Sequence, residues 1–125
     1  MKERLVIPGR LPGLNEYIAA EREHRQRGAR LKRACEDMIC YEIARQMRGV
    51  RFASPVHMRY LWVEKNRRRD KDNISSMGRK LIQDALVRQK VLANDGWENI
   101  SGFSDCFAVD GKRPRIEVEI DDETD

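Results

Sequence analysis

Residues 55–89 read PVHMRYLWVEKNRRRDKDNISSMGRKLIQDALVRQ and contain the two clearest periodic patterns in the chain. The first part of this stretch alternates with period two, which predicts a strand from Pro55 to Val63. One face of this strand carries Val56, Met58, Tyr60 and Trp62. From about Asn73 to Gln89 the apolar residues are spaced by three and four, which predicts a helix. Its buried face carries Ile74, Met77, Leu81, Ile82, Ala85 and Leu86.

The connection between this strand and this helix carries two aspartates in a cationic surround. In an extended segment, residues two apart point to the same side, so Asp70 and Asp72 can face one point in space. The segment Lys65–Lys71 holds five cations in seven residues. Carboxylate oxygens in such a surround suit a hard divalent metal that acts on a polyanion. An ordinary solvated turn with surface ion pairs fits the same residues, and both interpretations stay open at this point.

Towards the N-terminus, the sequence predicts one strand, one loop and one helix. The apolar run Leu5–Ile7, closed by Pro8 and Gly9, predicts the first strand, and residues 12–15 predict a turn or irregular loop. A helical pattern then extends from about Gly28 to Arg48. Six cations precede and enter it, and they are interpreted either as a phosphate-contacting surface or as a solvated helix start: Arg22, Arg25, Arg27, Arg30, Lys32 and Arg33.

Towards the C-terminus, a turn is followed by two strands. Residues 94–96 read Asn-Asp-Gly, which is turn chemistry, so Asp95 is at least a turn former. Strands are predicted from Ile100 to Val109 and around residues 115–120. The chain is therefore expected to be one α+β domain over residues 1–120, in the order β-α-β-α-β-β, with helices packed against a mixed sheet. Residues 121–125 form an acidic tail that is expected to be disordered.

The composition favours a polyanionic partner. The formal net charge is +4, and it rises to +8 without the four acids of the last five residues. Such a body is attracted to phosphate backbones or anionic membranes. No apolar run approaches the roughly 20 residues that span a bilayer, and no signal peptide opens the chain, so we expect a cytoplasmic protein that does not enter a membrane. The three cysteines show no zinc-type spacing and are expected to be reduced.

Several motifs, taken in order, resemble the RusA family of Holliday junction resolvases. They are Arg68-Arg69-Asp70-Lys71-Asp72-Asn73, then Lys80, then Asp84-Ala85-Leu86, then Asn94-Asp95. The N-terminal half resembles the family only in layout, through Leu5–Ile7 and Asn15. The resemblance implies a small homodimeric, Mg²⁺-dependent endonuclease of a kind common in prophages. Such enzymes nick strands of like polarity across a four-way DNA junction in recombination and repair.

The resemblance also implies a set of site residues. The acidic triad, which is both catalytic and metal-binding, carries over to Asp70, Asp72 and Asp95, and the essential lysine to Lys80. Mg²⁺ is the implied cofactor, with Mn²⁺ as a substitute. The DNA-binding residues are expected among the six cations of residues 22–33 and among Arg67, Arg68 and Arg69.

Two features depart from the family pattern. The spacing from Asp72 to the lysine is longer by about one helical turn, so Lys80 regains the family position only if the helix starts later. Lys80 and Asp84 also fit a plain surface pair four residues apart. Asn94 stands where an acid often precedes the last aspartate.

Three carboxylates that meet at one point repel one another and need a positively charged partner. At about 5 Å and an effective dielectric near 20, each pair repels by roughly 3 kcal/mol. A metal ion or neighbouring arginines must offset this repulsion. Two other functions stay open: a less selective branched-DNA or flap endonuclease, and a basic dimer that binds branched DNA without cutting it, its acids being ion-paired.

Overall fold

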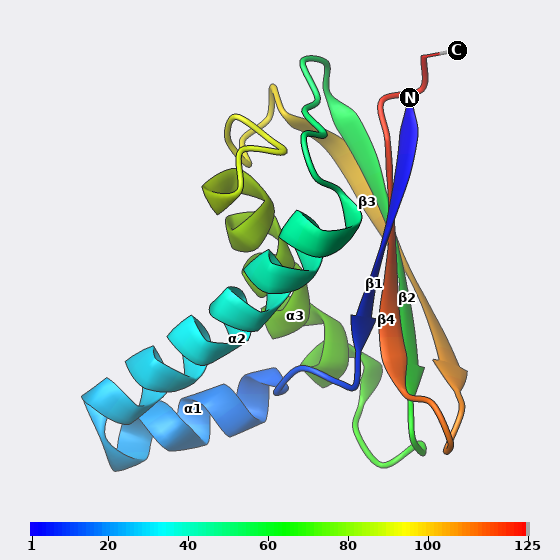
Figure 1. Ribbon diagram of the computed structural model, residues 1–125. Coiled ribbons are helices and arrows are strands. Elements are labelled where there is room, and N and C mark those ends of the chain that lie inside the picture. The colour runs from blue at the N-terminus through cyan, green and yellow to red at the C-terminus, as the bar shows by residue number, and fades with distance from the viewer. Residues whose placement is uncertain (125) are drawn as a thin grey trace.

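Four strands form one mixed sheet, and three helices lie on one side of it, in a computed structural model that describes residues 1–124 (Figure 1). Along the chain the elements are β1 (Lys2–Pro8), α1 (Leu14–Glu23), α2 (Arg25–Gln46), β2 (Val56–Glu64), α3 (Lys71–Arg88), β3 (Ile100–Val109) and β4 (Arg115–Asp121). The strand order is β1-β4-β2-β3, with β2 parallel to β3 and antiparallel to β4. The predicted α+β class and mixed sheet are confirmed, and the predicted element order holds when α1 and α2 count as one helical hairpin.

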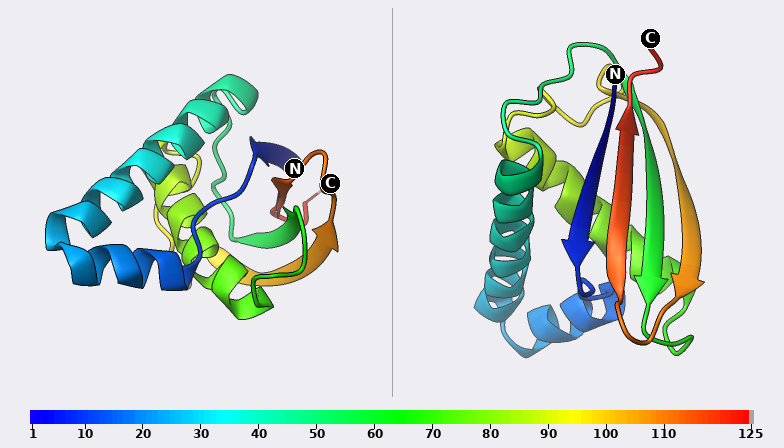
Figure 2. Two further views of the ribbon diagram at one scale, coloured as in Figure 1. Left: turned by 90° about the horizontal axis from the view of Figure 1, so that it is seen from below. Right: turned by 45° about the vertical axis from the view of Figure 1, so that its right-hand side comes forward.

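Strand β2 lies inside the sheet, and its alternation separates a covered face from an open one. Val56, Met58, Tyr60 and Trp62, which were predicted to share one face, are all buried beneath the helices. The opposite face of the sheet carries no helix (Figure 2). Burial of side chains of this size stabilises a fold by about 1.5–3 kcal/mol each. The covered face of β2 is therefore a firm base for α3.

Helix α3 packs on β2 through the face that the sequence predicted, and all six predicted residues are buried. Gly78 faces Trp62: a Cβ atom there would lie 2.6 Å from two carbons of the indole ring, so glycine permits the close approach of helix and strand. The helix begins at Lys71, two residues earlier than predicted, with Asp70 rather than Asp72 at the N-cap. Aspartate is favourable both at an N-cap and in the first turn, so the pattern does not separate the two positions.

The α1–α2 hairpin corrects the prediction for the N-terminal half. Residues 14 and 15, expected in a loop, begin α1, and α2 begins at Arg25 with His24 as its N-cap. The His24 Nδ1 atom accepts a hydrogen bond of 3.1 Å from the backbone N–H of Gln26. No residue of α1 is fully buried, and its apolar residues Leu14, Tyr17 and Ile18, of which the first two pack partly against the core, span little more than one turn. The hairpin extends sideways away from the sheet (Figure 2).

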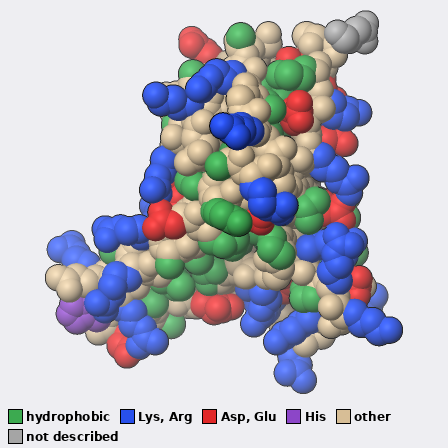
Figure 3. All heavy atoms as spheres, viewed as in Figure 1, with side chains coloured by type: hydrophobic (Ala, Val, Ile, Leu, Met, Phe, Trp, Pro, Cys, Tyr) green, Lys and Arg blue, Asp and Glu red, His purple; other side chains and the backbone are tan. Residues whose placement is uncertain are grey.

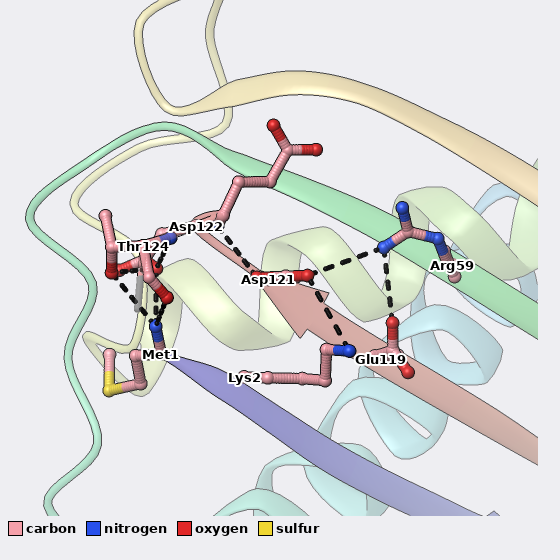
Figure 4. Close-up of polar contacts among 8 residues, drawn as sticks. Met1, Lys2, Arg59, Glu119, Asp121, Asp122 and Thr124 are labelled. Carbon is pink, nitrogen blue, oxygen red and sulfur yellow. Dashed lines mark hydrogen bonds and ion pairs between the residues drawn. The ribbon is translucent and has the colours of Figure 1, made fainter.

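The acidic tail is a second correction, because residues 121–124 are held against the N-terminus. Asp121 ends β4, where it pairs with Lys2 of β1. The Met1 ammonium donates to the Asp122 carboxylate at 2.7 Å and to Thr124 at 2.8 Å (backbone oxygen) and 3.0 Å (hydroxyl) (Figure 4). The negative charge of the tail is thus paired with the N-terminal ammonium, which lies at the same end of the sheet. Residue 125 lies outside the described residues.

Candidate functional site

The first turns of α1 and α3 meet at the predicted acidic pair. The backbone N–H of Asn15 donates to the Asn73 Oδ1 atom at 2.8 Å. Gly13 is the N-cap of α1, and a Cβ atom there would lie 2.6 Å from the Asn73 Nδ2 atom. Helix N-termini carry partial positive charge, so two of them together favour carboxylates and phosphates nearby.

Within residues 1–124, the carboxylates of Asp70 and Asp72 have no side-chain partner. Asp70 is the N-cap of α3 and makes no side-chain capping bond, and Asp72 follows in the first turn. Both are exposed, and within residues 1–124 neither carboxylate forms an ion pair or hydrogen bond. By contrast, Asp84 has two cationic partners and Asp105 one. Exposed carboxylate oxygens without protein partners are suitable ligands for a hard cation such as Mg²⁺.

Arg69 fixes the segment that carries these acids. Its guanidinium donates two hydrogen bonds of 2.8 Å to Glu64 at the end of β2, and it also reaches the Leu11 carbonyl at 3.0 Å and Glu16 at 3.2 Å. The Arg69 and Glu64 side chains are 11% and 8% exposed. Arg69 was predicted to contact DNA, but its guanidinium donates its hydrogen bonds to groups inside the protein. Arg67 and Arg68 are exposed.

A cavity of about 600 Å³ opens beside Asp70. It lies between the segment after β2, the first turn of α3 and the end of β3, at the lower end of the sheet in Figure 1. Its apolar lining residues come mainly from β3, and its charged ones come from the end of β2, the segment after it and the start of α3. The lining comprises Glu64, Asn66, Arg67, Arg69, Asp70, Lys71, Ile74, Phe107, Ala108 and Val109.

Lys80 lies with the third predicted acid, Asp95. Its ammonium is 3.0 Å from an oxygen of Asp84 and 3.5 Å from one of Asp95. Lys32 of α2 approaches Asp84 at 4.0 Å. The hydrogen bond to Asp84, together with the charges of Asp84 and Asp95, raises the pKa of the Lys80 ammonium above its ordinary value. Lys80 is therefore a cation at neutral pH, suited to electrostatic stabilisation and not to proton abstraction.

The predicted triad does not meet at one point, because Asp95 contacts Lys80 in the middle of α3. Asp70 and Asp72 lie at its start, whereas Lys80 comes eight residues after Asp72, a rise of about 12 Å along a helix. Figure 1 shows the loop after α3 at the opposite end of that helix from the segment before it. Within residues 1–124, no three His, Cys, Asp or Glu side chains are grouped closely enough to hold one metal ion. The helix starts earlier than predicted, so the condition that would return Lys80 to the first two acids is not met.

The remaining predicted DNA contacts form a cationic surface on the helical hairpin. Arg22, Arg25, Arg27, Arg30 and Arg33 are exposed there. Figure 3 shows Lys and Arg side chains gathered over the far end of the hairpin and, separately, at the lower end of the sheet. Arg27 is paired with Glu23 at 2.5 Å.

Two residues that line the cavity, and one acid elsewhere on β3, were not predicted as site residues from the sequence. Glu64 and Phe107 lie near the ends of adjacent parallel strands, where side chains from distant parts of a chain converge. Asp105 accepts a 2.9 Å hydrogen bond from Trp62 Nε1 and pairs with Arg79. The isolated acid in an apolar strand was the available signal for Asp105. Asn94, whose role the sequence left open, accepts a 2.9 Å hydrogen bond from the backbone of Asp95 and so shapes that turn.

Comparisons with protein-family models and with curated proteins found no match to this chain. The resemblance to the RusA family therefore rests on the motifs quoted above. Within residues 1–124, no helix combines the length and the apolar character needed to cross a bilayer.

Proposed function

We propose that the chain is a metal-dependent endodeoxyribonuclease that resolves four-way DNA junctions in recombination and repair. The observation that carries this proposal is the pair of unpartnered carboxylates, Asp70 and Asp72, where two helix N-termini meet. A purely structural acid in this arginine-rich segment would be expected to pair with a neighbouring cation, and neither acid does so within the described chain. The motif resemblance supports the same activity.

Asp70 and Asp72 would hold Mg²⁺, because one or two carboxylates plus water and phosphate oxygens are its usual ligands. When bound, the metal supplies an activated water and stabilises the leaving oxygen. Arg67, Arg68 and Lys71 surround the pair and would bind the DNA phosphates on either side of the cut. The two helix N-termini would add to the attraction for phosphate.

Asp95 takes a different part in this proposal from the one that the family motif implies. It lies beside Lys80 and away from the first two acids, so we assign it as a positioning residue that orients the lysine. Lys80 would contact a DNA phosphate further along α3, away from the cut.

A symmetric dimer fits the proposed reaction, since two equivalent nicks need two equivalent sites. The exposed arginines of the α1–α2 hairpin would then hold the arms of the junction through their phosphates. Such binding weakens steeply as salt is raised.

The test is cleavage of a synthetic four-way junction with and without Mg²⁺, mapping both nicks. Asp72→Asn should abolish cleavage and retain junction binding, because it removes a metal-ligating charge from an exposed side chain. Asp37→Asn is the matched control, since Asp37 is an exposed helical aspartate that pairs only with Arg88. Equal cleavage by Asp72→Asn and the unaltered protein would contradict the proposal.

Two further substrates separate the alternative functions. Comparable cutting of a flap and of the four-way junction would indicate a less selective branched-DNA endonuclease. Metal-independent junction binding without cleavage in Mg²⁺ or Mn²⁺ would indicate the non-catalytic DNA-binding dimer.

A further inference from the structure

The cavity beside Asp70 is lined by both charged and apolar residues, so neither a bare anion nor a purely apolar ligand would contact all of its lining. Its volume of about 600 Å³ is in the range of small-molecule sites. On its apolar side, Phe107 is half-buried and Val109 is 49% exposed at the end of the edge strand β3. These apolar surfaces face open space next to charged groups.

The polar side of the cavity holds two uncommitted cations. Arg67 and Lys71 are exposed, and within residues 1–124 neither has an acidic partner. Arg69, the third cation of the lining, is neutralised by Glu64. The free charges facing the cavity are thus those of Arg67 and Lys71 against the single acid Asp70. Their sum is positive, which favours an anion.

The aromatic ring of Phe107 lies within reach of one of these cations. The Lys71 ammonium stands over the ring at 5.6 Å from its centroid. A flat heterocycle could take that place on the ring while the flexible lysine side chain turns to an attached phosphate. Stacking of one nucleobase on an aromatic side chain contributes about 1–3 kcal/mol and tolerates any base.

From these features we infer that the cavity holds one unpaired nucleotide of the DNA, with its base on Phe107 and its phosphate on Arg67 and Lys71. This inference rests on the proposed function for its biological setting. A base inside a duplex cannot enter such a cavity without leaving its stack, and unstacking costs least where pairing is already interrupted. The cavity therefore favours DNA in which a base next to the cut leaves its stack readily, as at a branch point, where continuous stacking is interrupted.

The first experiment needs no cleavage. Deoxyadenosine monophosphate is titrated into the ¹⁵N-labelled protein, and chemical shifts are followed by NMR. Shifts are expected at Lys71, Phe107 and Val109, with inorganic phosphate binding more weakly than the nucleotide. Phe107→Ala should weaken nucleotide binding about fivefold or more, the loss expected for one base–aromatic stack. Phe103→Ala is the matched control, because Phe103 lies four residues earlier on the same strand but outside this cavity.

Val109→Glu guards against a folding defect in Phe107→Ala. It alters an exposed side chain of the cavity lining and should also weaken nucleotide binding. Equal binding of inorganic phosphate and nucleotide, or unchanged nucleotide binding in both variants, would overturn the inference.

The second experiment places 2-aminopurine next to the branch point of a junction bound by Asp72→Asn. Its fluorescence should change on binding, and Phe107→Ala in the same background should remove that change. Failure of the proposed nuclease would look different: nucleotide binding would persist and no junction would be cut. Normal cleavage with no nucleotide bound in the cavity would reject only the inference.

Discussion

The Lys80 ammonium lies 3.5 Å from the Asp95 carboxylate, so the turn that follows α3 folds back onto the middle of that helix. This contact joins the proposed lysine to an aspartate that comes 15 residues later in the chain. Because of this contact, Asp95 can act through the position of the Lys80 side chain.

Lys80→Ala should weaken junction binding and have little effect on the rate of cleavage at saturating protein, because Lys80 lies about 12 Å along α3 from Asp72 and would contact a phosphate away from the cut. If Asp95 only orients the lysine, adding Asp95→Asn to Lys80→Ala should cause little further loss of affinity. Fluorescence anisotropy of a junction with the two single variants and the double variant measures this coupling. Independent, multiplying losses would show that Asp95 acts apart from Lys80.

The stabilisation of the fold by the ion pairs of Lys80 depends on pH in a defined direction. Its pKa is raised by Asp84 and Asp95, so the stabilisation from these contacts is complete below the ordinary lysine pKa and is lost as pH rises through the raised value. Asp84→Asn should move the pKa of Lys80 back towards its ordinary value, since the Asp84 hydrogen bond is the largest cause of the shift. NMR titration of the lysine side chains checks this, and an unchanged Lys80 midpoint would contradict it.

Arg69→Ala should destabilise the protein by about 3–5 kcal/mol, because it leaves the buried Glu64 carboxylate without its cation. Arg68→Ala is the matched control: Arg68 is the preceding residue and is exposed, so its removal should change stability by less than about 0.5 kcal/mol. Urea unfolding of both variants gives the free energies. Similar values for the two would show that the Arg69–Glu64 pair does not anchor the segment.

Arg30→Gln should weaken junction binding and lower the slope of log affinity against log salt by about 1, as expected for one lost phosphate contact. Arg30 is exposed on α2 and has no acidic partner within residues 1–124. Arg27→Gln should have a smaller effect, because Glu23 already neutralises Arg27. Fluorescence anisotropy at several salt concentrations measures both. An unchanged slope for Arg30→Gln would remove the hairpin from the DNA-binding surface.

The N-terminal ammonium and Thr124 lower the pKa of Asp122 to about 2. The corresponding stabilisation is present above the ordinary aspartate pKa and is lost as pH falls towards 2. Acetylation of the N-terminus should raise the Asp122 pKa, because it removes the positive charge that is the main cause of the shift. Carboxyl NMR titration with and without acetylation provides the measurement.

The sequence predicted those parts of the fold that a repeating apolar pattern encodes. The period-two pattern around Trp62 and the helical pattern around Leu81 both correspond to buried faces, and the strand Ile100–Val109 has the predicted ends. Helix α1 was missed because its apolar residues, Leu14, Tyr17 and Ile18, span little more than one turn and follow a Pro-Gly pair that indicates a turn. The position of β4 between β1 and β2 was not predicted either, since strand order depends on tertiary packing.

The site was predicted less completely than the fold, for a related reason. Asp70 and Asp72 are two residues apart, so their proximity was a local inference, but the extended segment expected to point both carboxylates to one side is replaced by the first turn of α3, in which residues two apart do not share a face. The position of Asp95 depends on how a turn folds back over a helix, and spacing along the chain does not specify that contact. The internal role of Arg69 likewise depends on Glu64, which becomes its partner only once β2 is in place.

Helix α1 buries no residue, whereas α3 buries eight. The free energy of local opening is lowest where few apolar contacts hold an element, so backbone amides of α1 should exchange with solvent long before those of α3. The molecule thus combines a stiff platform, which carries the carboxylates, with a more pliant helical arm next to the exposed arginines of residues 22–33. An arm of this kind can adjust to DNA arms that leave a branch at different angles while the platform keeps its shape.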